Sequence, residues 1–268
     1  GPRQARAGAV GLTIEGLVRA DEIVWDPLRL SAATARLAYR QGRLRATAIR
    51  ASVGGGSLEG EAEVDFAGRE PAIRVRGALA GVRAEEVAGA FFHAGWTVAG
   101  RMDLRSSFAW SGWPGEAGLG TVRGDASLRL TDGRVVGYRP LERLTDLLGP
   151  FLPAAGLGSR LEGFDELTGR FTLEKGTLRT DDLALRQGSG ELRAAGSLDL
   201  ATTALDVDVT AKRKRATVEA KVTGTTANPV VTPKLTRIER RIEAEVDKAL
   251  RGERGRKIRD LLQGLLKP

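Results

Sequence analysis

The stretch LTGRFTLEKGTLRTDDLAL, residues Leu167–Leu185, sets a pattern that recurs over most of the chain. Apolar residues alternate with polar ones on both sides of a glycine, Gly176. Successive side chains of a β-strand point to opposite faces, so a segment of this kind has one apolar face and one polar face. The pattern predicts amphipathic strands joined by tight turns, and it raises the question of what covers the apolar face.

The same alternation predicts strands along the chain as far as about Pro233. Turn signals separate them, as at Gly54–Gly56, Gly133 and Gly188–Gly190. Short strands with turns every roughly 8–12 residues are typical of an antiparallel meander rather than of a βαβ fold. The predicted strands are Gly11–Val18, Gly42–Ile49, Ser57–Phe66, Ala72–Leu79, Arg101–Trp110, Asp125–Leu130, Gly169–Leu173, Thr177–Leu178, Asp182–Arg186, Glu191–Leu200, Ala204–Thr210 and Thr217–Thr223.

Composition narrows the class of protein. The 268 residues carry a formal net charge of +8, and 28% of them are charged, which argues against a chain embedded in a bilayer. No apolar run approaches the roughly 18 residues that span a membrane. There is no cysteine, which excludes disulfides, cysteine-based zinc sites and thiol catalysis. Residues 1–10 look like an expression remnant or linker, so we expect any native signal or membrane anchor to lie outside this chain.

Helical signals are few. Arg83–Phe92 and Arg139–Leu152 each suit one short helix. Residues 234–268 predict an amphipathic tail of two helices with a break at Gly252–Gly255. The tail holds eleven Lys or Arg against six Asp or Glu. It suits either a plug at the open end of the sheet or a helix on an anionic membrane surface.

The sheet must bury its apolar face, and these helices are too few to cover it. It can fold onto itself as a sandwich, close as a barrel or curl into a trough. Aromatic residues make up only 5% of the chain, and the inward candidates are mostly Leu, Val and Ala. These features favour an all-β fold over residues 11–233: a long, antiparallel, strongly curved sheet forming an open apolar trough. An uncovered apolar floor of that size indicates a binding surface.

Side chains suited to catalysis or metal binding are sparse. His93 is the one histidine, and a lone histidine beside two phenylalanines suits a helix end or a core. Asp181 and Asp182 are adjacent and do not converge, so we interpret them as a turn. The basic run Ala211–Lys221 suits either exposed hairpin charge or attraction to anionic headgroups. It lacks the aromatics that nucleic-acid binding uses. We expect no enzyme activity, no metal, no cofactor and no nucleic-acid partner.

Three tryptophans, Trp96, Trp110 and Trp113, lie close together in the sequence. They suit either packing in a core or contact with a lipid or membrane interface, because tryptophan tolerates a half-apolar setting.

The segment Phe164–Val209 resembles the carboxy-terminal region of the AsmA-like family. The family pattern places a Phe before Leu-x-Gly-x-Phe-x-Leu, then a Gly turn, Leu-x-x-Asp-Leu-x-Leu and Gly-x-Leu-Asp-Leu. The matching residues here are Phe164, Leu167, Gly169, Phe171, Leu173, Gly176, Leu178, Asp182, Leu183, Leu185, Gly196, Leu198, Asp199 and Leu200. Val222–Pro233 looks like the closing Gly…Asn-Pro strand of the family. The preceding strands and Gly-rich turns are similar to its repeated unit.

The resemblance implies a periplasmic protein, held at the inner membrane by an amino-terminal helix that is absent from this chain. Family members count among the bridge-like lipid transfer proteins, which carry acyl chains in a β-groove between the inner and outer membranes. We therefore expect phospholipid or another acyl lipid as ligand. The candidate groove residues are Val64, Phe66, Ile73, Val75, Leu128, Leu130, Phe171, Leu173, Leu183, Leu185, Leu198, Leu200, Leu205, Val207 and Val209.

A membrane surface is the second expected partner. Its candidate contacts in the tail are Leu261, Leu262, Leu265, Leu266, Arg256, Lys257 and Arg259. The alternative function is that of a periplasmic scaffold for outer-membrane protein biogenesis. Such a scaffold would offer exposed sheet edges to outer-membrane proteins as partners.

Overall fold

The computed structural model describes residues 12–25, 28–91, 97–113, 119–136, 163–213 and 216–234. Within these ranges the chain forms one sheet of thirteen strands in sequence order, each antiparallel to the next. The strands are β1 Thr13–Trp25, β2 Leu28–Arg40, β3 Arg43–Val53, β4 Gly56–Asp65, β5 Ala72–Arg83, β6 Thr97–Ser111, β7 Arg123–Val136, β8 Gly163–Glu174, β9 Thr177–Gln187, β10 Gly190–Asp199, β11 Leu205–Arg213, β12 Ala216–Gly224 and β13 Pro229–Lys234.

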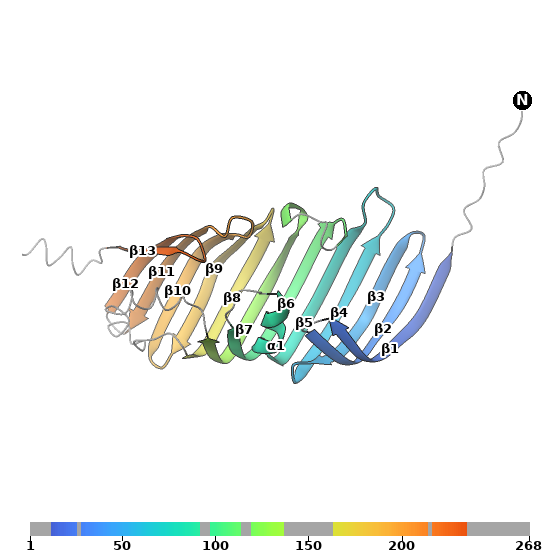
Figure 1. Cartoon of the computed structure of the whole chain (residues 1–268), viewed down its shortest axis with the longest axis horizontal. Helices are drawn as coiled ribbons and strands as arrows, with labels where there is room; N and C mark the ends of the chain where they lie inside the picture. Colours follow the sequence, from blue (N-terminus) through green and yellow to red (C-terminus); the bar gives the residue numbers. More distant parts are fainter. Residues whose placement is uncertain are drawn as a thin grey trace, which may run out of the picture.

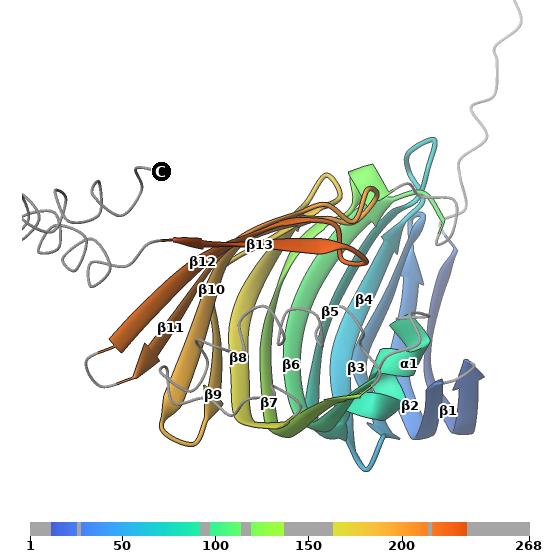
Figure 2. The same ribbon diagram turned by 60° about the vertical axis from the view of Figure 1, so that its left-hand side comes forward.

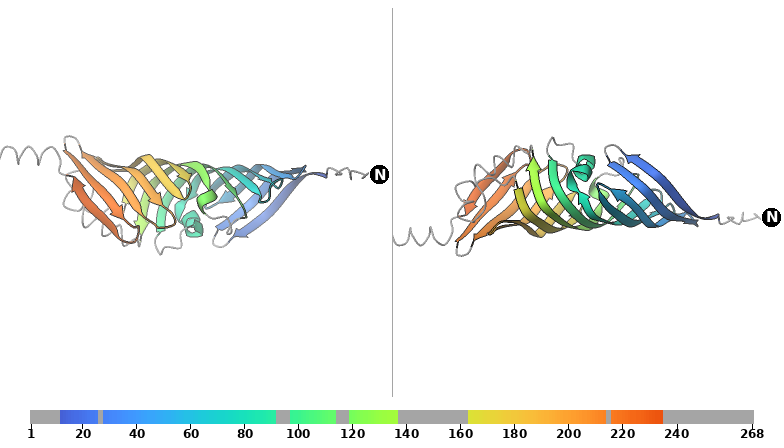
Figure 3. Two further views of the ribbon diagram at one scale, coloured as in Figure 1. Left: turned by 90° about the horizontal axis from the view of Figure 1, so that it is seen from above. Right: turned by 90° about the horizontal axis from the view of Figure 1, so that it is seen from below.

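The sheet is open and arched. Its strands lie side by side along the long axis of the molecule, and β1 and β13 are its two edges (Figure 1). The strands curve so that one face of the sheet is concave, and the single α-helix of the described chain, α1 (Ala84–Phe91), lies on that side (Figure 2). Views from above and below show the progressive twist from β1 to β13 (Figure 3). The prediction of an all-β antiparallel meander that curves without closing is confirmed.

Extra residues in several strands explain the curvature. The pairing register shifts by one residue within β3, β5, β7 and β9, each of which carries one residue more than its neighbour at that point. Ala48, Gly81 and Asp132 mark three of these bulges with positive φ angles. A β-bulge bends its strand and increases the local twist, so its repetition across the sheet produces an arch. Asp103 stabilises the bend in β5 by accepting a hydrogen bond from the Gly81 N–H over 2.8 Å.

The largest fully buried side chains, Val82 and Leu130, lie where α1 meets the concave face. Val82 is fully buried and packs in one cluster with Val53 and with Val87 of α1. Leu130, Phe164 and Ala84 form a second cluster beside it. Helix α1 begins directly after β5, and its acidic first turn, Glu85 and Glu86, suits the positive end of the helix dipole. The helix covers only part of the concave face (Figure 2).

Several sequence predictions are corrected. β1 continues to Trp25, and β2 was not predicted at all. Asp181 and Asp182 do not form a turn, because β9 runs through them as one strand with a bulge. The helix predicted at Arg83–Phe92 is confirmed by α1.

Three other predictions cannot be compared with the structure. Residues 1–10, the predicted helix Arg139–Leu152 and the tail beyond Lys234 lie outside the described residues.

We expect Leu130→Ala to lower the free energy of unfolding by about 3 kcal/mol, because it empties space beside Ala84 and Phe164 in a packed cluster. The leucine is only 2% exposed. Val24→Ala, at a valine that is 54% exposed, is the control and should change stability by less than about 0.5 kcal/mol. Urea denaturation followed by circular dichroism measures both. Equal effects of the two substitutions would contradict the packing described here.

Candidate functional site: the concave apolar face

The strand register aligns apolar side chains into rows across the concave face. Residues paired directly across antiparallel strands share a face of the sheet. The row nearest α1 is anchored by Val82 and Leu130, whose clusters include α1 residues. It reads Val82, Met102, Leu130, Leu167, Leu185, Leu192 and Ala211 from β5 to β11.

A second row lies further from the helix on the same face. It follows eight successive strands without a break: Ala62, Val75, Phe108, Gly124, Leu173, Leu178, Leu198 and Leu205. Its leucines are half-buried, so they keep apolar surface open toward the concave side. The concave face thus offers apolar surface that continues from strand to strand.

Small residues form a lane between rows of larger ones. Gly60, Gly77, Ser106 and Ala126 are paired in register across β4, β5, β6 and β7. The flanking row on the α1 side consists of Leu58, Leu79, Leu104 and Leu128. A ligand over this lane can approach the backbone closely, with the row of leucines on the α1 side and Val75 and Phe108 on the other side.

All but two of the predicted groove residues share this face. Val64, Ile73, Val75, Leu128, Leu130, Phe171, Leu173, Leu183, Leu185, Leu198, Leu205, Val207 and Val209 fall on it by register.

The other predicted residues lie elsewhere. Phe66 follows the end of β4, and Leu200 lies in the turn after β10. Leu200 donates its backbone N–H to the Gly176 carbonyl over 2.9 Å. The predicted membrane contacts from Arg256 to Leu266 lie outside the described residues.

The sequence prediction missed several apolar residues of this face. Leu58, Leu79, Leu104 and Phe108 lie within strands that were predicted, and Met102 shares their alternation in β6. The alternation of apolar and polar residues in these strands therefore already marked these side chains as members of the apolar face.

Trp113 does not pack in a core. It is 52% exposed, and its ring contacts Phe66, with the ring centroids 6.1 Å apart. Trp96 lies outside the described residues. The predicted cluster of three tryptophans can therefore be compared with the structure only for Trp110 and Trp113.

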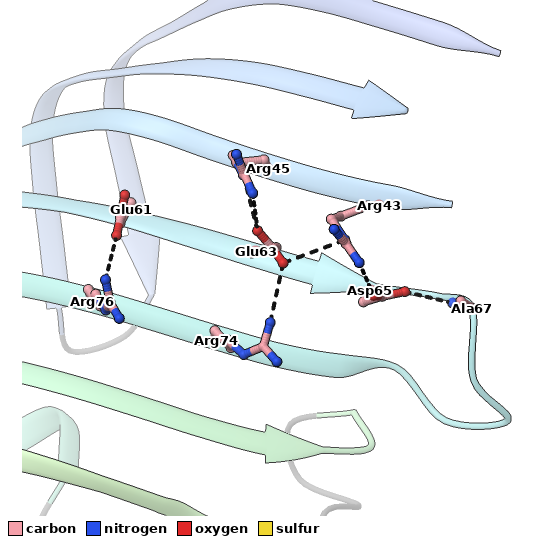
Figure 4. A network of polar contacts seen from close by, with 8 residues as sticks. All are labelled: Arg43, Arg45, Glu61, Glu63, Asp65, Ala67, Arg74 and Arg76. Atoms are coloured by element: carbon pink, nitrogen blue, oxygen red, sulfur yellow. Dashed lines mark hydrogen bonds and ion pairs between the residues drawn. The ribbon is translucent and has the colours of Figure 1, made fainter. Parts of the chain in front are cut away.

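The opposite face of the sheet carries charge. Glu63 lies among three arginines on β3 and β5: its carboxylate is 2.6 Å from Arg45, 3.4 Å from Arg74 and 3.5 Å from Arg43 (Figure 4). The hydrogen bond from Arg45, together with the positive charges of all three arginines, holds the pKa of Glu63 below its ordinary value despite partial desolvation. We call Glu63 and its three arginines the first charge ladder. Its carboxylate therefore stays ionised at neutral pH.

A second ladder repeats this arrangement further along the sheet. Glu166, with a side chain only 13% exposed, pairs with Arg129 at 2.7 Å and also with Arg186. At the bulge of β9, Asp182 accepts hydrogen bonds from the backbone N–H and the guanidinium of Arg170. These bonds lower the pKa of Asp182. Of the adjacent carboxylates Asp181 and Asp182, Asp182 therefore has a structural role in pairing β8 with β9.

An open hollow of about 770 Å³ lies over the first ladder, and its lining also includes Ala62, Phe108, Gly124 and Leu173 of the second row. Four arginines meet four carboxylates there, so its charge is balanced. No group of three potential metal ligands occurs in the described ranges. The charged lining residues are Arg45, Arg74, Arg76, Arg123, Glu61, Glu63, Asp125 and Glu174. Because the hollow is open and balanced in charge, we regard the concave apolar face as the better candidate site.

Comparison with known proteins gives one match. Over 205 residues, 75% of this chain, the sequence is 22% identical to Protein AsmA of Escherichia coli (strain K12). The chain is thus similar to AsmA over most of its own length. It spans 33% of that relative's length. No family model matches the sequence, and no solved structure matches the fold.

Across the part of the chain that the structure describes, no helix has the length and apolar character to cross a membrane.

The charge ladders predict acid sensitivity. A carboxylate whose pKa is lowered by folding stabilises the fold above its unfolded pKa, about 4.3 for Glu, and loses this contribution as the pH falls through its folded pKa. We expect the urea midpoint to fall as the pH drops from about 5 to 3, and to fall less in Glu63→Gln. Glu59→Gln, at a side chain 66% exposed, is the control. A Glu63→Gln profile identical to wild type would contradict this role.

Proposed function

We propose that the chain binds the acyl chains of phospholipids on its concave apolar face. It would do so as part of an AsmA-like protein that carries lipid between the inner and outer membranes. The observation that carries the proposal is the unbroken apolar row from Ala62 in β4 to Leu205 in β11. An exposed apolar surface of this extent marks a binding site for an apolar ligand. The family's link to outer-membrane assembly or lipid transport supports the same conclusion.

The energetics suit transport without covalent chemistry. An acyl chain gains on the order of 0.8 kcal/mol for each CH2 that leaves water. Since the row repeats from one strand to the next, a lipid shifted by one strand exchanges one set of apolar contacts for a similar set. The energy changes little along the sheet, and sliding is therefore favoured over tight binding at one position.

The lane of small residues gives the acyl chain a path. Gly60, Gly77, Ser106 and Ala126 leave room above the backbone, while Leu79 and Val75 flank the lane on β5. The lipid headgroup would stay at the rim of the arch in water. The proposed location is the periplasm, with the whole protein held at the inner membrane.

The direct test is organic extraction of the purified protein, with mass spectrometry of the extract. We expect wild type to yield phospholipid and Leu173→Asp to yield several-fold less, because the new carboxylate would be desolvated by an acyl chain. Thr172→Asp is the matched control, since its side chain is exposed on the opposite face of the same strand and its yield should match wild type. Lipid-free wild-type protein, or an equal loss in both variants, would overturn the proposal.

A second variant blocks the lane without adding charge. A Cβ at Gly77 would meet its nearest atom, the Glu59 carbonyl oxygen, at 3.5 Å, an ordinary contact. Gly77→Leu should therefore fold like wild type and bind less lipid, because its side chain fills the lane. Gly120→Leu, in the exposed turn before β7 where nothing lies within 4 Å, is the control. Unchanged lipid yield in a folded Gly77→Leu protein would show that acyl chains do not use the lane.

A further inference from the structure

The apolar floor of β4–β7, the concave side of these four strands, has two different ends along the strands. At one end β5 leads directly into α1. At the other end Phe66 follows β4, and Gly112 and Trp113 follow β6. Because neighbouring strands run in opposite directions, Phe66 and Trp113 lie at the strand ends opposite to α1, which occupies the lower ends in Figure 2. We call the end that carries Phe66 and Trp113 the aromatic rim.

The α1 end of the floor is closed and apolar. Val82 is fully buried there, in one cluster with a residue of the helix. The first turn of α1 adds the carboxylates of Glu85 and Glu86. Arg83 donates to Glu86 over 2.7 Å, and by register it shares the opposite face of the sheet with Arg101. The concave side of this end therefore suits the end of an acyl chain and disfavours a phosphate.

The aromatic rim is exposed and held in place. Phe66 is 39% exposed, and its ring contacts the half-exposed Trp113. The Phe66 N–H donates to the Gly42 carbonyl over 2.8 Å, and the Gly112 N–H donates to the Pro71 carbonyl over 2.9 Å. These bonds fix the backbone at or next to each aromatic residue. Partly exposed aromatic rings suit the boundary between acyl chains and water.

Charged groups that could meet a lipid headgroup lie beyond the rim and not on the floor. By register, the rows from Leu79 to Ile73 carry no charged residue on the described strands β4–β7. A phosphate on this floor would lose water without gaining a partner. The loop after Phe66 carries Arg69 and Glu70, which are exposed and form no ion pair among the described residues. A guanidinium of this kind can bind a phosphate, so the rim offers what the floor lacks.

The floor between the two ends matches the length of an acyl chain. Six residue steps along β5 separate Leu79, which packs in the cluster of α1, from Ile73, which pairs with Trp110 near the rim. At about 3.3 Å per residue this distance is about 20 Å. The acyl chains of one leaflet fill half of the hydrocarbon thickness of a bilayer, about 15 Å. A lipid that lies along the strands therefore fits between α1 and the aromatic rim.

We propose that a phospholipid lies along strands β4–β7 with its acyl ends against α1 and its headgroup at the aromatic rim. This inference rests on the proposed function and adds the direction in which the lipid lies. Helix α1 is then the stop that limits acyl length. A lipid that moves from strand to strand keeps this direction, so its headgroup stays in water along the rim opposite to α1.

The test uses two photoreactive phosphatidylcholines, one with a diazirine at the acyl end and one with a diazirine on the headgroup. Each is loaded into the purified chain from vesicles and irradiated, and mass spectrometry of peptides locates the adducts. We expect the acyl-end probe to label the row of Leu79 and Leu104, and the headgroup probe to label Phe66, Trp113 and the loop of Arg69.

The pattern of labelling separates this inference from the proposed function. Adducts on the concave face with the two probes reversed, or with both probes at both ends equally, would overturn the direction of the lipid and leave lipid binding intact. If neither probe labels the concave face, the proposed function fails and this inference fails with it.

A variant tests the role of α1 as a stop. Leu104→Trp fills the floor in front of the helix, so acyl ends lose contacts there. In competition between a short-chain and a long-chain phosphatidylcholine, the preference for the long chain should fall about tenfold for roughly every two CH2 groups displaced. Arg105→Trp, at an exposed position on the opposite face of the same strand, is the matched control and should keep the wild-type preference. An unchanged preference in Leu104→Trp protein with wild-type circular dichroism would overturn the proposed stop.

Discussion

The whole structure depends on antiparallel register. Along each strand every second side chain is apolar, and a slip of one residue would move that entire set to the opposite face. The observed pairings keep the apolar sets aligned from β4 to β11, as in the run that joins Val75, Phe108 and Leu173. The charged ladders give the other face its own register, since Glu63 meets Arg45 and Arg74 only in this alignment. Both faces of the sheet therefore specify the same pairing.

An amphipathic sheet of this kind is stable without covering its apolar side completely. Helix α1 supplies a local core around Val82 and Leu130, and the remaining apolar rows stay half-open along the arch. A sandwich or a closed barrel would have consumed this surface in its own core. Bulges in several strands instead give the arch its curvature while leaving its two ends apart. The arrangement therefore has the shape and surface that the proposed lipid ligand requires.

Much of this arrangement was predictable from alternation and glycine turns, and the exceptions have physical causes. β2 went unrecognised because SAATARLAYR, residues 31–40, is rich in alanine, which has low strand propensity; here pairing with β1 and β3 overrides it. The bulge at Ala48 carries no glycine to signal it. The turn predicted at Gly133 is wrong, because β7 continues through Gly133 to Val136 and the glycine follows the bulge at Asp132. Each bulge also resets which parity of residues faces inward, so alternation alone could not fix the concave face. Phe66 and Leu200 were misplaced because each lies just past a strand end, where alternation no longer determines direction.

The most direct test of the account is photocrosslinking from neighbouring positions on one strand. A photoreactive amino acid at Leu104 lies on the concave face beside the lane of small residues, and one at Arg105 lies on the opposite face of β6. After irradiation of the protein in cells and purification, mass spectrometry identifies any attached lipid. The account predicts phospholipid adducts at position 104 and none at position 105. Adducts at neither position, or at both equally, would contradict the claim that the concave apolar face binds acyl chains.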